Sequence, residues 1–186
     1  MCGIISTMSS VQPHEVPSGS FLHKYSGSSG FADCYVTEVE GMITQAAFIE
    51  AFYTSALFKV ERTLLTYLAS RPATDDDARQ LAAGKASTFS AWSVESQTAT
   101  ELLLADFSGR TRSWLMVRPS AQHAPATSTL LYFGSAVVAL NPRGSRPARM
   151  GWLFHALLGF HRLYSRLLLF VASKRVAKTW PALTPL

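Results

Sequence analysis

The sequence predicts one α+β domain in which a curved antiparallel sheet carries a helix pair after its first strand and a long C-terminal helix packed across it. Three observations support this class. Segments rich in β-branched and aromatic residues fill the middle of the chain, two helical patterns follow the first such segment, and a long amphipathic pattern closes the sequence. With 186 residues, of which 48% are hydrophobic, the chain suits one domain with a substantial core.

Composition divides the chain into three parts. Residues 1–30 are dominated by Ser, Gly and Pro and show neither period 2 nor period 3.6, which predicts a flexible leader. The single folded domain is expected over residues 31–178, and residues 179–186 form a C-terminal tail.

The first folded elements are a strand and a helix pair. Residues 31–40 are rich in aromatic and β-branched types, which favours a strand. Thr44 stands where an N-cap is expected before the first helix, and residues 57–69 have the spacing of the second. A short third helix begins with the acidic run 75–77, which suits the helix dipole, and Gly84 caps its end.

The remaining strands follow one another through short turns, so the sheet is expected to be antiparallel. Ser108 and Gly109 suit a two-residue hairpin loop, which would pair Leu103 with Trp114. The same register pairs Ala105 with Arg112. With the first strand this makes five, the other four being residues 86–96, 99–107, 110–118 and 128–140.

A helix over residues 148–176 is the strongest single element. One narrow stripe of it is polar or small, and the opposite side is apolar. Most of its circumference is nevertheless apolar, so we expect packing on more than one side. The narrow stripe holds His155, Gly159, Arg162, Arg166 and Ser173; the opposite side holds Leu153, Leu157, Phe160, Tyr164, Leu167 and Val171.

Charge is divided unequally along the chain. Through Asp106 there are 12 acidic residues and 6 Lys or Arg, whereas residues 107–186 hold 11 Lys or Arg and no acidic residue. One interpretation is that the two halves offset each other in a mixed surface. The other is a basic face for phosphate-bearing partners such as anionic lipid or nucleic acid.

The sequence favours the cytoplasm. Its two cysteines, Cys2 and Cys34, give no basis for a disulfide framework, which indicates a reducing compartment. The first residues lack the Lys or Arg followed by an apolar run that is typical of a signal peptide. Histidines and arginines interrupt the apolar region 151–173, so an integral membrane protein is disfavoured.

No motif indicates a cofactor, a metal or a catalytic residue. Cys2 would be an N-terminal nucleophile after removal of Met1, as in glutamine amidotransferases, but the further motifs of those enzymes are missing. Neither a P-loop nor a dinucleotide fingerprint occurs, and the five histidines lack the spacing of a zinc site. Without a visible nucleophile and base, the sequence does not point to an enzyme.

Charged residues cluster in the predicted hairpins beside Trp92, Trp114 and Tyr132. An antiparallel sheet usually keeps one face wet, so one interpretation is a cross-strand ladder of ion pairs on a solvent face. Alternatively, Arg112 and Trp114, alternate residues on the same face, line a pocket for an acidic or aromatic ligand. The charged residues are Glu95, Glu101, Asp106, Arg110 and Arg112.

The order of elements, together with the runs Gly109 to Val117 and Leu131 to Ser135, resembles the START-like helix-grip (SRPBCC) superfamily in a bacterial branch. The resemblance is architectural and covers about residues 31–178. It implies a last helix that lies across a curved sheet above a cavity for lipids, sterols, polyketides or other apolar ligands. The full helix-grip sheet has seven strands, whereas five are counted here.

We therefore expect a protein that binds a small apolar or amphipathic molecule between the sheet and the C-terminal helix. An alternative is a peripheral protein that binds an anionic membrane surface, with no nucleic acid expected. A third is a cyclase- or hydrolase-like enzyme using Asp106, Arg112 or His161, the last as a pocket acid or donor unless it is merely structural. The expected ligand-binding residues are Trp92, Arg112, Trp114 and Tyr132 from the strands and Phe160, His161, Tyr164 and Leu167 from the helix.

Overall fold

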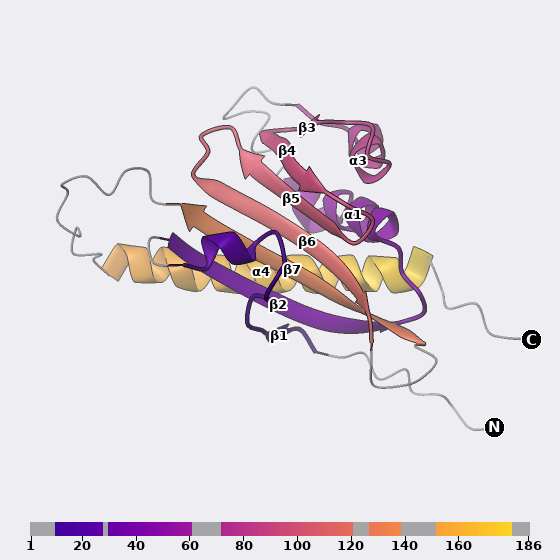
Figure 1. The fold of residues 1–186 in the computed structure, drawn as a ribbon, viewed down its shortest axis with the longest axis horizontal. Coiled ribbons are helices and arrows are strands. Elements are labelled where there is room, and N and C mark those ends of the chain that lie inside the picture. The colour runs from indigo at the N-terminus through magenta and orange to yellow at the C-terminus, as the bar shows by residue number, and fades with distance from the viewer. Residues whose placement is uncertain (1–9, 28–29, 61–71, 121–126, 139–151, 180–186) are drawn as a thin grey trace, which may run out of the picture.

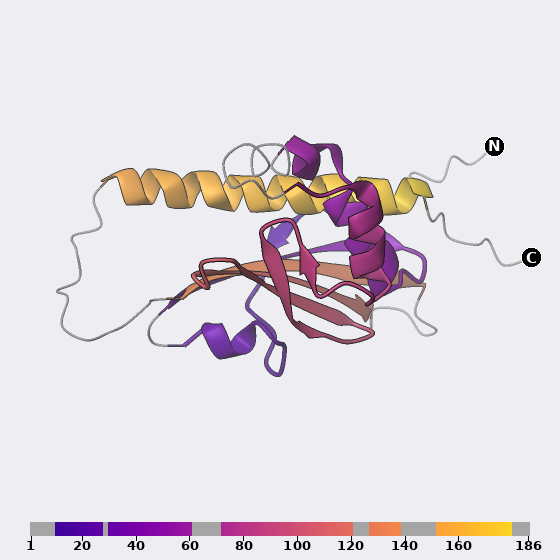
Figure 2. The same ribbon diagram turned by 90° about the horizontal axis from the view of Figure 1, so that it is seen from above.

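The computed structural model describes residues 10–27, 30–60, 72–120, 127–138 and 152–179. Within these ranges the α+β class is confirmed: an antiparallel sheet packs against helices, and the long C-terminal helix lies along one of its faces (Figures 1 and 2). The helices are α1 (Gln45–Tyr53), α3 (Asp75–Ala82), α4 (Trp152–Thr179) and the short 3-10 helix η1 (His23–Tyr25).

Seven strands of the described chain form one sheet in the order β1-β2-β7-β6-β5-β4-β3. Every neighbouring pair is antiparallel, as predicted. Five strands were expected, and the two additional ones have only two residues each, too short to carry a period-2 pattern. The strands are β1 (Gln12–Pro13), β2 (Gly30–Glu40), β3 (Thr88–Phe89), β4 (Trp92–Gln97), β5 (Glu101–Asp106), β6 (Thr111–Pro119) and β7 (Ser128–Val138).

Local sequence signals set the helix starts and the central hairpin. The Thr44 side chain accepts a hydrogen bond from the Ala47 amide and caps α1. Thr74 and Asp77 form a reciprocal capping box at the start of α3. The predicted pairing of Leu103 with Trp114 is confirmed in the β5–β6 hairpin. The predicted second helix falls mostly on residues 61–71, outside the described residues.

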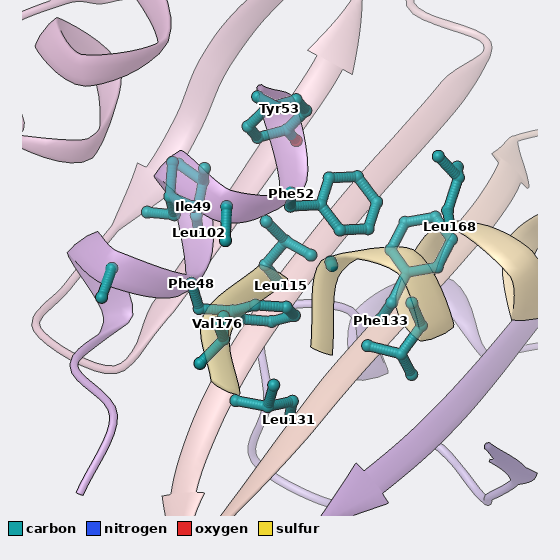
Figure 3. Packing of buried hydrophobic residues seen from close by; sticks show 14 of the residues in the cluster. Phe48, Ile49, Phe52, Tyr53, Leu102, Leu115, Leu131, Phe133, Leu168 and Val176 are labelled. Atoms are coloured by element: carbon teal, nitrogen blue, oxygen red, sulfur yellow. The ribbon is translucent and has the colours of Figure 1, made fainter. Parts of the chain in front are cut away.

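The main core lies between the sheet and the helices. Figure 3 shows Phe48 and Phe52 from α1 meeting Leu115 and Phe133 from the sheet. Leu168 and Val176 contribute from α4 to the same cluster, and each is 3% exposed or less. Burial of each large apolar side chain contributes about 1.5–3 kcal/mol, so this layer holds α1 and α4 on the sheet.

The face that α4 presents to this core differs from the expected one. We expected Tyr164 and Leu167 to face the cavity; Tyr164 lines the pocket under the helix, but Leu167 is 44% exposed. The side chains buried in its place are centred more than a third of a turn away around the helix. They are Ser165, Leu168, Leu169, Ala172, Ser173 and Val176. A helix that is apolar around most of its circumference does not reveal by periodicity which side the sheet will cover.

Residues 10–27, expected to belong to a flexible leader, pack on the opposite face of the sheet (Figure 2). β1 pairs with β2, and Leu22 is fully buried. A second cluster forms there from Leu22, Cys34, Leu103, Trp114, Met116, Tyr132 and Ala136. The sheet is therefore covered on both faces, and the side chains of each strand are divided between two separate cores.

Candidate functional site

A pocket of about 290 Å³ lies between α4 and the sheet. This volume is at the lower end of the range of small-molecule sites, about 300–1,000 Å³. Apolar side chains from α1, the segment after it, the sheet and α4 make most of its wall, and Phe107, which is 66% exposed, also borders it. The principal apolar lining residues are Phe52, Phe58, Trp92, Phe133, Tyr164 and Leu168.

Two buried side-chain atoms of residues that line this pocket have no hydrogen-bond partner among the described residues. They are the indole Nε1 of Trp92 and the hydroxyl Oγ of Ser165. Five such buried side-chain atoms occur in the described chain, and two of them line this one pocket. An unsatisfied buried polar group costs about 1–3 kcal/mol, so a ligand that supplies an acceptor here would offset that cost.

Ser135 and His161 line the pocket and belong to a polar cluster that joins β2, β7 and α4. The Ser135 Oγ donates to Asp33 Oδ1 over 2.6 Å and lies 2.7 Å from His161 Nε2. His161 Nε2 is also 3.7 Å from Asp33 Oδ2, and the Tyr35 hydroxyl donates to the same oxygen over 3.3 Å. The cluster therefore ties the helix to the two strands beneath it.

This cluster is not arranged as a nucleophilic triad. A serine nucleophile gives its proton to a histidine whose other ring nitrogen contacts the carboxylate. Here the single hydroxyl hydrogen of Ser135 is directed to Asp33, so His161 Nε2 must act as the donor to Ser135. The imidazole of His161 therefore does not accept the Ser135 proton, as the histidine of such a triad would.

The ionised form of Asp33 is favoured in this setting. Burial acts to raise the pKa of Asp33, but the interactions with His161 and Ser135 outweigh it, and the pKa lies below its ordinary value. The pKa of the adjacent Tyr35 hydroxyl shifts in the opposite direction. Burial and the Asp33 charge raise it to about 12. Asp33 thus acts as a fixed negative charge that two hydroxyls stabilise.

A second, more open hollow of about 500 Å³ lies beside α4 on the side of β2. Arg162, Leu163 and Arg166 form its helical wall, and Phe31 and Tyr35 are among the residues of the strand wall. The Arg162 guanidinium lies 5.8 Å from the centre of the Phe31 ring, within the range of a cation–π contact.

Two of the charged residues predicted in the hairpins, Glu95 and Arg112, bind the N-terminal segment on the other face of the sheet. Glu95 accepts hydrogen bonds from the Tyr25 hydroxyl and from Arg112 Nε, each at 2.6 Å, and forms an ion pair with Lys24. Burial tends to raise the pKa of Glu95, but these three partners lower it overall. The expected ion-pair cluster therefore exists, but residues 10–27 cover it in place of solvent.

Glu101 has a similar role. Its Oε2 accepts both the Trp114 indole N–H and the Phe21 amide, each over 2.9 Å. Trp114 is fully buried in the second cluster, so its polar edge is satisfied there.

The structure brings together only some of the expected ligand-binding residues. Trp92, His161 and Tyr164 line the pocket under α4, as does Arg112, although the Arg112 guanidinium bonds to Glu95, Tyr25 and the Gly109 carbonyl. Three of the remaining four, Trp114, Tyr132 and Leu167, are not among the residues that line it. Trp114 and Tyr132 belong to the opposite face, Leu167 points outward, and the side chain of Phe160 lies outside the described residues.

Strand alternation explains this separation. Successive side chains of a strand point to opposite faces, so Ser113 and Leu115 share the α4 side while Trp114 faces away. In β7, Phe133 and Ser135 likewise face α4, whereas Tyr132 does not. The expected aromatic set mixed both faces because the sequence does not reveal that both are covered.

Several residues that line the pocket were not expected from the sequence, and Ser165 is the one among them whose buried hydroxyl has no partner in the described part of the chain. It lies one helical turn before Leu168 and Leu169 and is 1% exposed. A hydroxyl inside a buried apolar stripe is the signal that could have identified it, once the correct stripe was known.

Comparisons of the chain with protein-family models, with curated proteins and with solved structures find no match. Among the described residues, no cluster of three or more His, Cys, Asp or Glu side chains could hold a metal ion. No helix in the described ranges has the length and apolar character needed to cross a membrane.

Proposed function

We propose that this protein binds a small amphipathic molecule in the pocket between α4 and the sheet. The observation that carries the proposal is an aromatic pocket of about 290 Å³ in which Trp92 Nε1 and Ser165 Oγ have no partner among the described residues. The apolar body of the ligand packs against the aromatic wall, and an acceptor group at its polar end receives these two hydrogen bonds.

The polar groups of the pocket wall favour an amphipathic ligand held in one orientation over a purely apolar ligand. Trp92 Nε1 can only donate, so it selects an oxygen or another acceptor. Ser165 Oγ can donate to the same group, and His161 and Ser135 add further polarity to the wall. The antiparallel sheet with a C-terminal helix across it is also compatible with the START-like helix-grip architecture, whose members hold apolar ligands in this position.

The test uses 1-anilinonaphthalene-8-sulfonate, an aromatic probe with an acceptor group, and measures its fluorescence titration against the folded protein. Trp92→Phe keeps an aromatic ring but removes the donor, and we expect its affinity for the probe to fall about 5- to 10-fold, the value of one hydrogen bond. Ser165→Ala should have a similar effect. Both variants should be at least as stable to urea as the parent, because each loses a buried polar atom that has no partner among the described residues.

Tyr132→Phe is the matched control. It also removes one polar atom from a large aromatic residue, but on the opposite face of the sheet, so it should leave probe affinity unchanged. The proposal fails if the probe does not bind, or if all three variants weaken it equally. If the proposal holds, native mass spectrometry of the protein purified from its own host would identify the natural ligand directly.

A further inference from the structure

The side of α4 that runs from the hollow beside β2 out to solvent combines exposed apolar and basic side chains. Leu163 is 58% exposed, and Leu167 and Phe170 are each 44% exposed. Arg162, Arg166 and Lys174 are exposed beside them. At 100° per residue these six side chains span about 140° of the helix surface. We call this set the outer face of α4: Arg162, Leu163, Arg166, Leu167, Phe170 and Lys174.

The two arginines of the outer face, Arg162 and Arg166, form no ion pair among the described residues. No acidic residue occurs in residues 107–186. Arg162 lies over the Phe31 ring. The nearest carboxylate in the adjoining hollow, Asp33, is already bound by Ser135 and Tyr35. The two guanidinium groups are therefore available to an external anion.

Apolar and basic groups are arranged here as in a helix that lies in the plane of a membrane interface. Phe170 and the two leucines would enter the boundary between headgroups and acyl chains, and the long basic side chains would extend to the phosphates. Lys174 Nζ already lies 5.4 Å from the centre of the Phe170 ring, so charge and apolar surface are directly adjacent. The 500 Å³ hollow beside Arg162 and Arg166 adds room for a headgroup.

We propose that the outer face of α4 docks the protein reversibly onto an anionic lipid bilayer. Charge complementarity selects this partner over a second copy of the chain. In a symmetric dimer the same patch meets itself, so arginines and lysine of one copy would face those of the other without an acid between them. A phosphate-rich surface satisfies the same groups.

The experiment is co-sedimentation of the full chain with phosphatidylcholine vesicles, with and without phosphatidylserine, at low and moderate salt. Arg162→Gln with Arg166→Gln removes two charges from the outer face, and we expect the partition coefficient on phosphatidylserine vesicles to fall roughly 30-fold. Arg110→Gln with Arg118→Gln is the matched control. It lowers the net charge equally at two other exposed positions and should change binding by no more than about threefold.

A third variant tests the apolar contribution. Leu163→Gln with Leu167→Gln leaves the charge unchanged and should also weaken pelleting, since both side chains are already exposed and neither lines the pocket under α4. Support requires binding that depends on phosphatidylserine, weakens with salt and is lost specifically in the two outer-face variants.

Several results would overturn the proposal. Equal binding to neutral and anionic vesicles, or no binding to either, excludes electrostatic docking. An equal loss in both arginine double variants would show attraction by net charge without a specific face. A dimer in sedimentation equilibrium that dissociates on Leu163→Gln with Leu167→Gln would assign the face to a second copy. None of these results bears on the pocket under α4, which has its own test.

Discussion

At the scale of single residues, the polar groups of this protein are used mainly as ties between segments that are distant in sequence. Asp33 holds Ser135, which in turn contacts His161 on α4. Glu101 holds both Trp114 and the Phe21 amide. Each carboxylate accepts at least two hydrogen bonds in a region partly closed to water, where such bonds are stronger than at the surface.

The Asp33 tie predicts a dependence of stability on pH. The folded pKa of Asp33 lies below its unfolded value, so its contribution is complete above the unfolded pKa and is lost as the pH falls through the folded pKa. We expect Asp33→Asn to be about 1–3 kcal/mol less stable than the parent at neutral pH, the value of hydrogen bonds to a buried charge. Urea unfolding as a function of pH measures the difference.

The difference in the free energy of unfolding between parent and variant should begin to shrink below about pH 4, where Asp33 of the unfolded chain takes up a proton. It should vanish as the pH falls through the lower pKa of the folded state. Asp76→Asn serves as control, because Asp76 is exposed outside this cluster and should leave the pH dependence nearly unchanged. If the difference in unfolding free energy between the parent and Asp33→Asn stays constant down to acid pH, Asp33 is not the source of the pH dependence.

At the scale of elements, the local sequence determines where a helix begins but not which of its faces is buried. The boundaries of α1 and α3 follow from Thr44 and Thr74, whose hydroxyls accept from amides three residues later. The inward face of α4 follows instead from where α1, β2 and β7 leave space for it. Leu167 and Leu168 are chemically identical, yet one is exposed and the other buried.

The capping box of α3 gives a prediction at this scale. Thr74→Ala removes the acceptor of the Asp77 amide and should lower the free energy of unfolding by about 1 kcal/mol, while Thr74→Ser retains the hydroxyl and most of the stability. Chemical denaturation of the two variants measures the effect. Equal stability of the Ala and Ser variants would show that the cap contributes nothing.

At the scale of the whole molecule, the sheet is the middle layer of three. Helices α1 and α4 cover one face, and residues 10–27 cover the other (Figure 2). Gly134 marks how closely the N-terminal segment approaches β7: a Cβ there would lie 2.5 Å from a Leu22 methyl, 2.8 Å from the Asp33 carbonyl oxygen and 3.1 Å from the Trp114 ring. The absence of a side chain at Gly134 permits this close packing.

Leu22 is therefore expected to hold the N-terminal segment in place. Leu22→Ala should cost about 2–5 kcal/mol, because it leaves a cavity beside Trp114 and Cys34. Phe107→Ala, a truncation of a large side chain that is 66% exposed, should cost much less. Thermal or urea unfolding compares the two.

The reactivity of the Cys34 thiol tests whether Leu22→Ala loosens the structure around the second cluster. Burial and the nearby Asp33 raise the pKa of Cys34 to about 12, so in a Cys2→Ser background the Cys34 thiol should resist a disulfide reagent at neutral pH. Leu22→Ala should make it react faster through local opening. Unchanged reactivity together with unchanged stability would mean that the segment does not protect this face.

The sequence by itself determined the α+β class, the antiparallel hairpin that pairs Leu103 with Trp114, the helix caps and the long C-terminal helix. These features depend on interactions within a few residues or on a short, well-defined turn. Only the tertiary structure decided which face of α4 is buried, that residues 10–27 cover the sheet, and which aromatic residues border the pocket. Those outcomes depend on competition between distant segments for the same surface, and a side chain such as Leu167 or Trp114 carries no local mark of which segment will cover it.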